Sequence, residues 1–220
     1  VHYITTAADC ARLMSEYNHQ LNTGKLKPIV YVDSEYTAPK STGGIDVIQF
    51  CFSNLDVAIV HLSLFIEGRE FPLELTTLLE SDDIVKMGSF FTQVDCVRLL
   101  GSYGIVVANA TNLHTTIEEL SGEKLATTKG TRNFEGLYKA YVTQEPALVK
   151  AKKTARSDWS KKLNKSQLSY AAIDVSGAKL IHEAAIARHK KKAKPMRMCV
   201  LDGEMGAKAK AVAALFNSLN

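Results

Sequence analysis

Two carboxylates lie two residues apart, directly after an apolar run of β-branched and aromatic residues at positions 28–32. They belong to Asp33 and Glu35, with Ser34 between them. On an extended strand alternate residues share a face, so both carboxylates project to the same side. Carboxylates this close repel each other unless a cation lies between them, and hard divalent cations such as Mg²⁺ prefer oxygen ligands. The pair is therefore consistent with a metal site, although acidic residues at strand ends are more often plain turn formers.

Two further segments carry residues of the same chemical kind. Tyr170 and Asp174 are four residues apart in a helical pattern, which places them one turn apart on one face. Asp95 stands among apolar neighbours early in another helical pattern, where an unpaired carboxylate is costly. Taken singly, Tyr170 and Asp174 fit an ordinary helix surface. Asp95 alone fits a helix N-terminal acid equally well.

The ordered set resembles the DEDD superfamily of 3′–5′ exonucleases, in its Tyr-containing branch, whose members include ribonuclease D and Werner-syndrome exonuclease domains. D-x-E at 33–35, Asp95 and Y-x-x-x-D at 170–174 carry the resemblance. S-D-W-S at 157–160 with Gln167 is similar to the lead-in of the third motif, and V-K-M-G at 85–88 is similar to the start of the second. The resemblance covers residues 1–187.

The resemblance implies a metal-dependent 3′–5′ exonuclease that releases nucleoside 5′-monophosphates from single-stranded or frayed RNA or DNA. Asp33, Glu35 and Asp174 would bind the catalytic one of two divalent ions (Mg²⁺ or Mn²⁺), and Asp33 would bridge to the second. Asp95 would reach the second ion through water, and Tyr170 would orient the attacking water. The implied fold is α/β and ribonuclease H-like: a five-stranded mixed sheet flanked by helices, with a short C-terminal extension.

Aromatic residues beside the acids are candidates for contact with the terminal bases of a nucleic acid. Tyr36 follows the acid pair, and Phe90 and Phe91 precede Asp95. Aromatic rings stack on bases of any sequence. We expect one of the two phenylalanines to be a core residue instead.

A basic stretch precedes the Tyr-containing helix. Lys153, Arg156, Lys161 and Lys162 belong to a group of seven cations within 16 residues, interrupted by Asp158 alone. Phosphate binding and a plain solvated face are about equally good interpretations.

Two departures from the family pattern support an alternative function. Asp95 comes seven residues after Gly88, one more than the second motif is expected to have, so a bulge or a shifted helix start could displace it. The C-terminal D-x-E at 202–204 has no partner acids and is predicted not to be catalytic. The alternative is a catalytically silent domain that acts as an RNA-binding or protein-interaction scaffold. An endonuclease or nucleotidyl transferase is a weaker third possibility, because the Tyr-to-Asp spacing of four argues against it.

The elements that position these residues are predicted from hydrophobic periodicity. Strands are expected at the N-terminus and at 28–32, 45–52, 57–65, 84–87 and 105–108. Helices are expected after Thr6 and at 73–80, 92–100, 113–120, 134–142 and 165–189. This order of a strand meander followed by alternating helices and strands is typical of a mixed α/β domain.

Composition bounds the class of protein and its organisation. The chain has 220 residues, of which 46% are hydrophobic and 23% charged, as in globular proteins. No apolar run is long enough to span a membrane, and the four cysteines are widely spaced, which favours free thiols inside the cell, in nucleus or cytoplasm. A lysine run at 190–194 separates an exonuclease domain at 1–189 from an extension at 190–220 that could bind a protein partner.

The net charge of +4 is unevenly distributed along the chain. Residues 1–100 hold 7 Lys and Arg against 13 Asp and Glu, whereas residues 101–220 hold 20 against 10. An acidic site beside a basic face suits a polyanion that is drawn toward bound cations.

Overall fold

A computed structural model describes residues 1–37, 44–66, 71–125, 133–142 and 152–190. The elements run in the following order: β1 (His2–Ile4), α1 (Ala7–Asn22), β2 (Ile29–Glu35), β3 (Val47–Cys51), β4 (Val57–Val60), a 3₁₀ helix (Leu62–Leu64), α2 (Leu73–Glu80), β5 (Val85–Gly88), α3 (Asp95–Tyr103), β6 (Ala110–Asn112), α4 (Leu113–Ser121), α5 (Phe134–Tyr141), α6 (Lys152–Ala155) and α7 (Lys165–Lys190).

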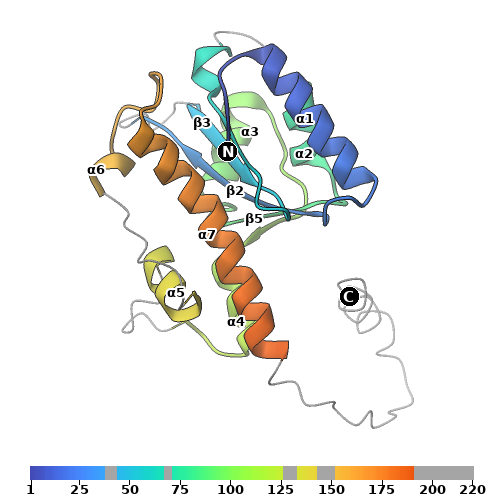
Figure 1. The fold of residues 1–220 in the computed structure, drawn as a ribbon, viewed down its shortest axis with the longest axis vertical. Helices are drawn as coiled ribbons and strands as arrows, with labels where there is room; N and C mark the ends of the chain where they lie inside the picture. Colours follow the sequence, from blue (N-terminus) through green and yellow to red (C-terminus); the bar gives the residue numbers. More distant parts are fainter. Residues whose placement is uncertain (38–43, 67–70, 126–132, 143–151, 191–220) are drawn as a thin grey trace. The chain divides into compact units, whose positions relative to one another are not determined.

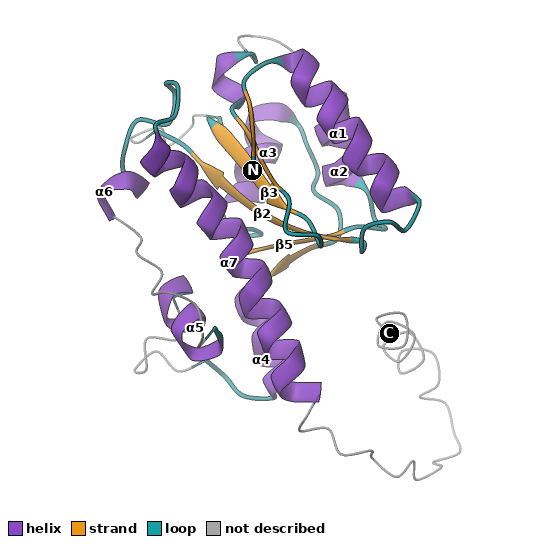
Figure 2. Cartoon of the chain, in the orientation of Figure 1, coloured by secondary structure: helices purple, strands orange, loops and turns teal. Residues whose placement is uncertain are grey.

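One mixed sheet organises the described residues, with the strand order β1-β4-β3-β2-β5-β6 (Figure 2). The central strand β2 is antiparallel to β3 and parallel to β5. The predicted α/β class is confirmed. Among the described residues the sheet has six strands, as many as hydrophobic periodicity predicts and one more than the five that the family resemblance implies. The three-residue β1, the expected N-terminal strand, lies parallel to β4 at the edge of the sheet.

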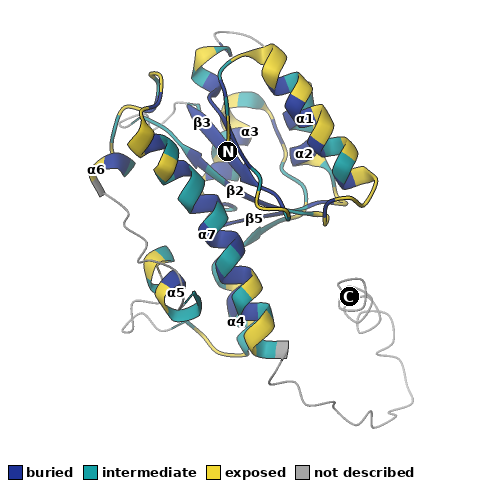
Figure 3. Ribbon diagram, in the orientation of Figure 1, coloured by how far each residue is buried: buried dark blue, intermediate teal, exposed yellow. Residues whose placement is uncertain are grey.

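Alternation along the strands sends side chains into two separate cores. Val30 and Val32 of β2 pack with α1, α2 and α3 on one face of the sheet. Tyr31 lies on the other face, in a second core with residues of α4, α5 and α7. Figure 1 shows α7 crossing the sheet on this second face, and Figure 3 shows the strands buried between the helices. Asp33 and Glu35 share the parity of Tyr31, so they face α7.

Several predicted boundaries move. The strand predicted at 57–65 ends at Val60, after which the chain enters the 3₁₀ helix. The last strand is Ala110–Asn112 rather than 105–108, because Gly104 ends α3 in the left-handed conformation and the segment after it is a loop. The helix predicted at 92–100 begins at Asp95.

Residues Val1–His189 form one compact unit. The extension at 190–220, with its D-x-E at 202–204, lies outside the described residues apart from the last residue of α7, so the proposed domain boundary and partner surface stay predictions. Among the described residues, no helix is long and apolar enough to cross a membrane.

Candidate active site

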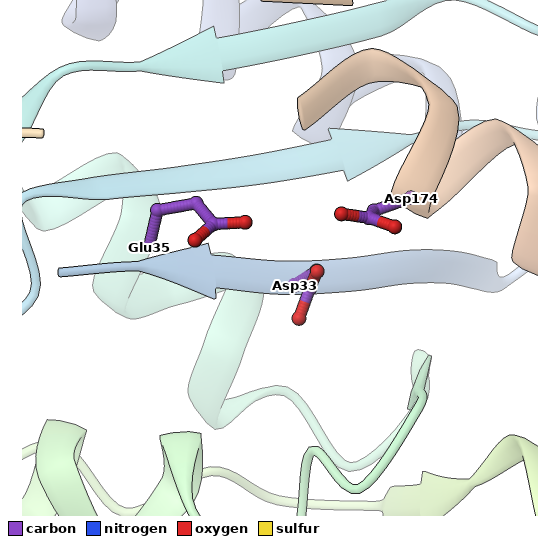
Figure 4. A group of neighbouring side chains, drawn as sticks. All are labelled: Asp33, Glu35 and Asp174. Atoms are coloured by element: carbon purple, nitrogen blue, oxygen red, sulfur yellow. The ribbon is translucent and has the colours of Figure 1, made fainter. Parts of the chain in front are cut away.

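Three carboxylates converge between the sheet and α7. Asp33 and Glu35 come from the end of β2 and Asp174 from α7, and each offers an oxygen within 4.8 Å of the others. Figure 4 shows the three carboxylates facing one another across the gap between strand and helix. Asp174 is buried and the other two are half-buried. Three acids this close suit a divalent cation, because a cation offsets their mutual repulsion.

Small residues allow α7 to lie close to the acids of β2. Ala171 and Ala178 are buried in the second core, one turn before and one turn after Asp174. The start of the helix is fixed by a reciprocal cap: the Gln167 backbone N–H donates to Asn164 Oδ1 at 3.0 Å, and the Asn164 N–H donates to Gln167 Oε1 at 3.1 Å. This arrangement has the geometry of a capping box. Its role is to set where the turns that carry Tyr170 and Asp174 fall.

A set of hydrogen bonds to the Thr37 hydroxyl, called the clasp below, joins the start of α7 to the end of the acidic strand β2. Thr37 Oγ1, two residues after Glu35, accepts the backbone N–H groups of Trp159 at 2.9 Å and Ser160 at 3.1 Å. The same hydroxyl donates to Asp158 Oδ1 at 3.2 Å. The S-D-W-S segment therefore anchors the lead-in of α7 against the end of β2. Trp159 itself is fully buried, as a packing residue.

Tyr170 lies at the same place as the acids and is held in its protonated form. Burial, and then the negative charges of Glu35 and Asp33, raise its pKa to about 12. A phenol with this pKa donates a hydrogen bond rather than losing its proton near neutrality. Its chemical capacity is therefore to orient an oxygen beside the carboxylates.

Asp95 is placed differently from the other three acids. Its carboxylate accepts a hydrogen bond from the hydroxyl of Ser34, whose side chain leaves β2 on the opposite face from Asp33 and Glu35. It is not one of the converging carboxylates among the described residues. Burial raises the pKa of Asp95 to about 6, while the hydrogen bond from Ser34 opposes this rise.

The turn before Asp95, where the sequence predicted a bulge or a shifted helix start, has a constrained backbone. Phe90 has a left-handed backbone, with φ of 60°, which a non-glycine residue adopts only under local constraint. The N–H groups of Asp95 and Cys96 both donate to the Phe91 carbonyl at 3.1 Å. Gly88 is required at the start of the turn, because a Cβ there would overlap the Val32 carbonyl oxygen.

The two phenylalanines of this turn differ in burial. Phe91 is fully buried in the first core, so this structure gives it a packing role rather than the predicted contact with nucleic acid. Phe90 is 47% exposed, and its ring stacks on His114 with centroids 4.6 Å apart. Phe90 is therefore the one of the pair that a base could contact.

A cavity of about 460 Å³ opens beside the converging acids. Its lining includes residues from both ends of the chain: Asp33, Glu35, Tyr36, Phe90, Phe134, Arg156, Tyr170 and Asp174. The Tyr36 ring is covered by the guanidinium of Arg98, 3.6 Å from its centroid. Three of the predicted nucleic-acid contacts, Tyr36, Phe90 and Arg156, thus line one cavity, although Tyr36 already has a cationic neighbour on one face.

The basic residues divide between the cavity and the outer surface. Arg156 is exposed and lines the cavity, whereas Lys153 and Lys162 are exposed and do not belong to its lining. Lys161 forms an ion pair with Asp158 at 3.2 Å. Arg156 has the best placement for a phosphate.

Sequence reasoning missed Thr37, Arg98 and Phe134. The signal for Thr37 was present, because a hydroxyl residue two positions after the acids can accept backbone N–H groups. Its partners, however, lie more than 120 residues away and no local pattern identifies them. Arg98 lies in a helical pattern, and a cation in such a pattern is usually predicted to be a solvated side chain.

Comparison with known proteins decides the family. A family model described as 3′-5′ exonuclease matches residues 1–183. The chain belongs to this family. It is 28% identical over 185 residues to the mouse (Mus musculus) bifunctional 3′-5′ exonuclease/ATP-dependent helicase WRN, which covers 82% of this chain and 12% of that protein. The resemblance inferred from the ordered acids is thereby confirmed at the level of the family.

Solved structures of other exonucleases are similar to this chain. Escherichia coli RNase D, described as an exoribonuclease involved in structured RNA processing, gives a TM-score of 0.66 at 18% identity, over 86% of this chain and 45% of that one. The EXD2 exonuclease domain soaked in Mn and GMP gives a TM-score of 0.48 at 17% identity, over 92% of this chain and 98% of that one. The similarity to RNase D shows that the described part of this 3′–5′ exonuclease family member is ribonuclease H-like in architecture.

Proposed function

We propose that this family member is an active, metal-dependent 3′–5′ exonuclease of the Tyr-containing DEDD type. The observation that carries the proposal is the convergence of Asp33, Glu35 and Asp174 beside the protonated hydroxyl of Tyr170, in one cavity. Oxygen ligands in this number and chemistry fit Mg²⁺ or Mn²⁺. The substrate is the 3′ end of a single-stranded or frayed RNA or DNA, and the product is a nucleoside 5′-monophosphate.

The roles of the residues follow from their placement. Asp33, Glu35 and Asp174 hold the catalytic cation, and Tyr170 donates its hydroxyl proton to a hydrogen bond that orients the attacking water. Two divalent ions bound here would lower the pKa of water toward about 7 and neutralise charge at the leaving oxygen. Asp95 would reach the second ion through water, and its carboxylate accepts a hydrogen bond from Ser34.

The rest of the cavity fits a nucleic-acid end. Arg156 offers a bidentate donor for a phosphate oxygen, and Phe90 and Tyr36 offer rings for the terminal bases. We infer the same intracellular location, nucleus or cytoplasm, that the spaced cysteines favour.

The test uses 5′-labelled single-stranded RNA and DNA, each incubated with the protein in Mg²⁺, in Mn²⁺ or in EDTA. The expected result is a one-nucleotide ladder that requires metal and is absent with Asp33→Asn. This variant also controls for contaminating nucleases. The better substrate identifies the sugar preference. Intact substrate under every metal condition would contradict the proposal.

The placement of Asp95 favours a second candidate function, a catalytically silent domain that binds RNA or protein. Its carboxylate is engaged by Ser34 and stands apart from the three converging acids. A titration with Mn²⁺ separates the two functions, because a ligand that binds the folded state alone raises the melting temperature by mass action. A silent domain without a metal site would gain no stability from the ion.

A further inference from the structure

Gln49 lies beside the converging acids, in the middle of β3. It is directly opposite Asp33 in the antiparallel pairing of β2 and β3. Residues directly opposite in such a pair project to the same face, with Cβ atoms about 4.5–5.5 Å apart. Its neighbours two positions away, Val47 and Cys51, belong to the core beneath α7. Gln49 therefore shares the face on which the metal ligands lie.

The side chain of Gln49 is fully buried and without partners. Its exposed fraction is 0%. Neither Nε2 nor Oε1 has a hydrogen-bond partner within the part of the chain that the structure describes. A buried amide in this condition has lost its hydrogen bonds to water and gained none in return, which disfavours folding. An apolar side chain of the same length would fill the position without that cost.

Asp33, directly opposite Gln49 in the strand pairing, carries a carboxylate that can accept a hydrogen bond from this amide. Carboxylates that bind metals are usually held by a further hydrogen bond, which fixes their orientation. We propose that Gln49 is a positioning residue for Asp33: in the metal-bound protein its amide N–H donates to the carboxylate oxygen that faces away from the cation. This inference rests on the proposed function.

The decisive experiment compares Mn²⁺ binding by the wild-type protein and by Gln49→Met, through thermal melting across a range of Mn²⁺ concentrations. Methionine keeps the length of the side chain and removes both polar groups. Without metal, Gln49→Met melts at the same temperature as wild type or higher. Its affinity for Mn²⁺ falls about 10- to 100-fold, the usual effect of removing a residue that supports a metal ligand.

Cys51→Ala is the matched control. Cys51 lies on the same strand and face but is opposite Tyr31 rather than Asp33. It is expected to lower the melting temperature without changing the affinity for Mn²⁺. Equal Mn²⁺ affinity in Gln49→Met and wild type would overturn the proposal, and would show that Gln49 meets only packing needs or a buried water.

A measurement on the wild-type protein decides the matter if Gln49→Met does not fold. In ¹⁵N-labelled protein, addition of diamagnetic Mg²⁺ is expected to shift one Gln49 side-chain amide proton downfield and slow its exchange. The side-chain amide of Asn18, which already donates to the Glu74 carbonyl at 3.0 Å in the other core, is the internal reference. A Gln49 proton that moves no more than this reference overturns the inference.

The outcomes for Gln49 and for the proposed function are distinguishable. Wild-type protein that gains no stability from Mn²⁺ and degrades no substrate contradicts the proposed function and this inference together. Wild-type protein that binds Mn²⁺ and hydrolyses RNA or DNA, with Gln49→Met equal to it in Mn²⁺ affinity, contradicts only the role of Gln49.

Discussion

The hydroxyl of Tyr170 stands among negative charges and is itself buried enough to stay neutral. The pKa of about 12 has burial as its largest cause and the two acids of β2 as its second. The raised pKa matters for chemistry, because a neutral phenol can donate one hydrogen bond to a water but cannot act as the base. In the proposed reaction, proton removal would therefore fall to the bound cation and its carboxylates.

Tyr170→Phe tests whether the Tyr170 hydroxyl orients the water without binding the metal. It removes one hydrogen-bond donor and leaves the ring, so the rate of the chemical step is expected to fall about 100-fold, as when one oriented donor is lost from other active sites. KM for a single-stranded oligonucleotide and the affinity for Mn²⁺ should stay near wild type. Single-turnover hydrolysis of 5′-labelled substrate measures the effect. A large loss of Mn²⁺ affinity would show that Tyr170 serves the metal instead.

Phe90→Ala tests the exposed aromatic of the second motif. Stacking of a base on an aromatic ring contributes about 1–3 kcal/mol, so the affinity for single-stranded oligonucleotide should fall about 5- to 100-fold. Fluorescence anisotropy in Ca²⁺, where hydrolysis is slow, gives the dissociation constant. Val97→Ala, on the exposed side of α3, is the control. If Phe90→Ala binds the oligonucleotide as tightly as wild type, Phe90 does not stack on a base and contributes only to the structure of the turn.

Some residue roles were predictable and others were not. Strand parity predicts that Asp33 and Glu35 share a face, the family resemblance adds Asp174, and the structure brings the oxygens of all three together. The contact between Ser34 and Asp95 depends on where α3 begins, and hence on the backbone conformation of the turn at Phe90. The burial of Phe91 beside an exposed Phe90 depends on that same backbone conformation, which no local pattern of hydrophobicity encodes.

At the scale of elements, the clasp at Thr37 determines where α7 starts relative to β2. Three interactions converge on one hydroxyl, and the capping pair of Asn164 and Gln167 continues the contact into the first turn of the helix. The Gln167 side chain also donates to the Asp158 carbonyl at 2.9 Å. The acidic strand and the Tyr-containing helix are therefore joined by polar contacts outside the catalytic residues.

Thr37→Val is predicted to loosen this junction. Valine keeps the shape but leaves the Trp159 N–H without its acceptor, so the free energy of unfolding should fall by about 1–3 kcal/mol. The affinity for Mn²⁺ should weaken as well, because Asp174 loses its fixed position relative to Asp33. Urea denaturation and a Mn²⁺ titration measure the two effects. Thr77→Val, on α2, removes a single local hydrogen bond and serves as the control.

The elements themselves were largely readable from periodicity. The helices at 73–80, 113–120 and 134–142 form at almost the predicted bounds, because amphipathic spacing and caps are local signals. The strand predicted at 105–108 shifted to Ala110–Asn112 because pairing with β5, rather than apolarity, decides which residues join the sheet. The edge pairing of β1 likewise depends on a distant partner.

At the scale of the whole domain, a buried polar contact holds the second face of the sheet to α7 in addition to the apolar core. Tyr31 on β2 and His182 on α7 join through the hydroxyl and Nδ1, 2.9 Å apart. Burial lowers the pKa of His182 to about 4, against the opposing effect of Glu183. The neutral imidazole is thus the form that the folded protein accommodates.

This contact predicts a loss of stability in acid. The pKa of His182 in the unfolded chain is about 6.5, so between pH 6.5 and pH 4 the unfolded state binds a proton that the folded state rejects. The contribution of His182 to the free energy of unfolding is fully present above pH 6.5 and is lost as the pH falls. By pH 5 this loss amounts to about 2 kcal/mol. His182→Gln should flatten that part of the curve, measured by urea denaturation from pH 7.5 to 4.5. A variant curve parallel to wild type would contradict the assignment.

The order in which the chain supplies its parts has a consequence for biosynthesis. Asp33 and Glu35 of β2 are synthesised early, but α7, which supplies Asp174, follows more than 130 residues later. Until then the apolar face of the sheet that α7 covers stays exposed. Contacts of such long sequence separation form late in folding. A nascent chain that ends before α7 holds only two of the converging carboxylates and an uncovered core. The three converging carboxylates therefore come together only after α7 has been synthesised and has packed on the sheet.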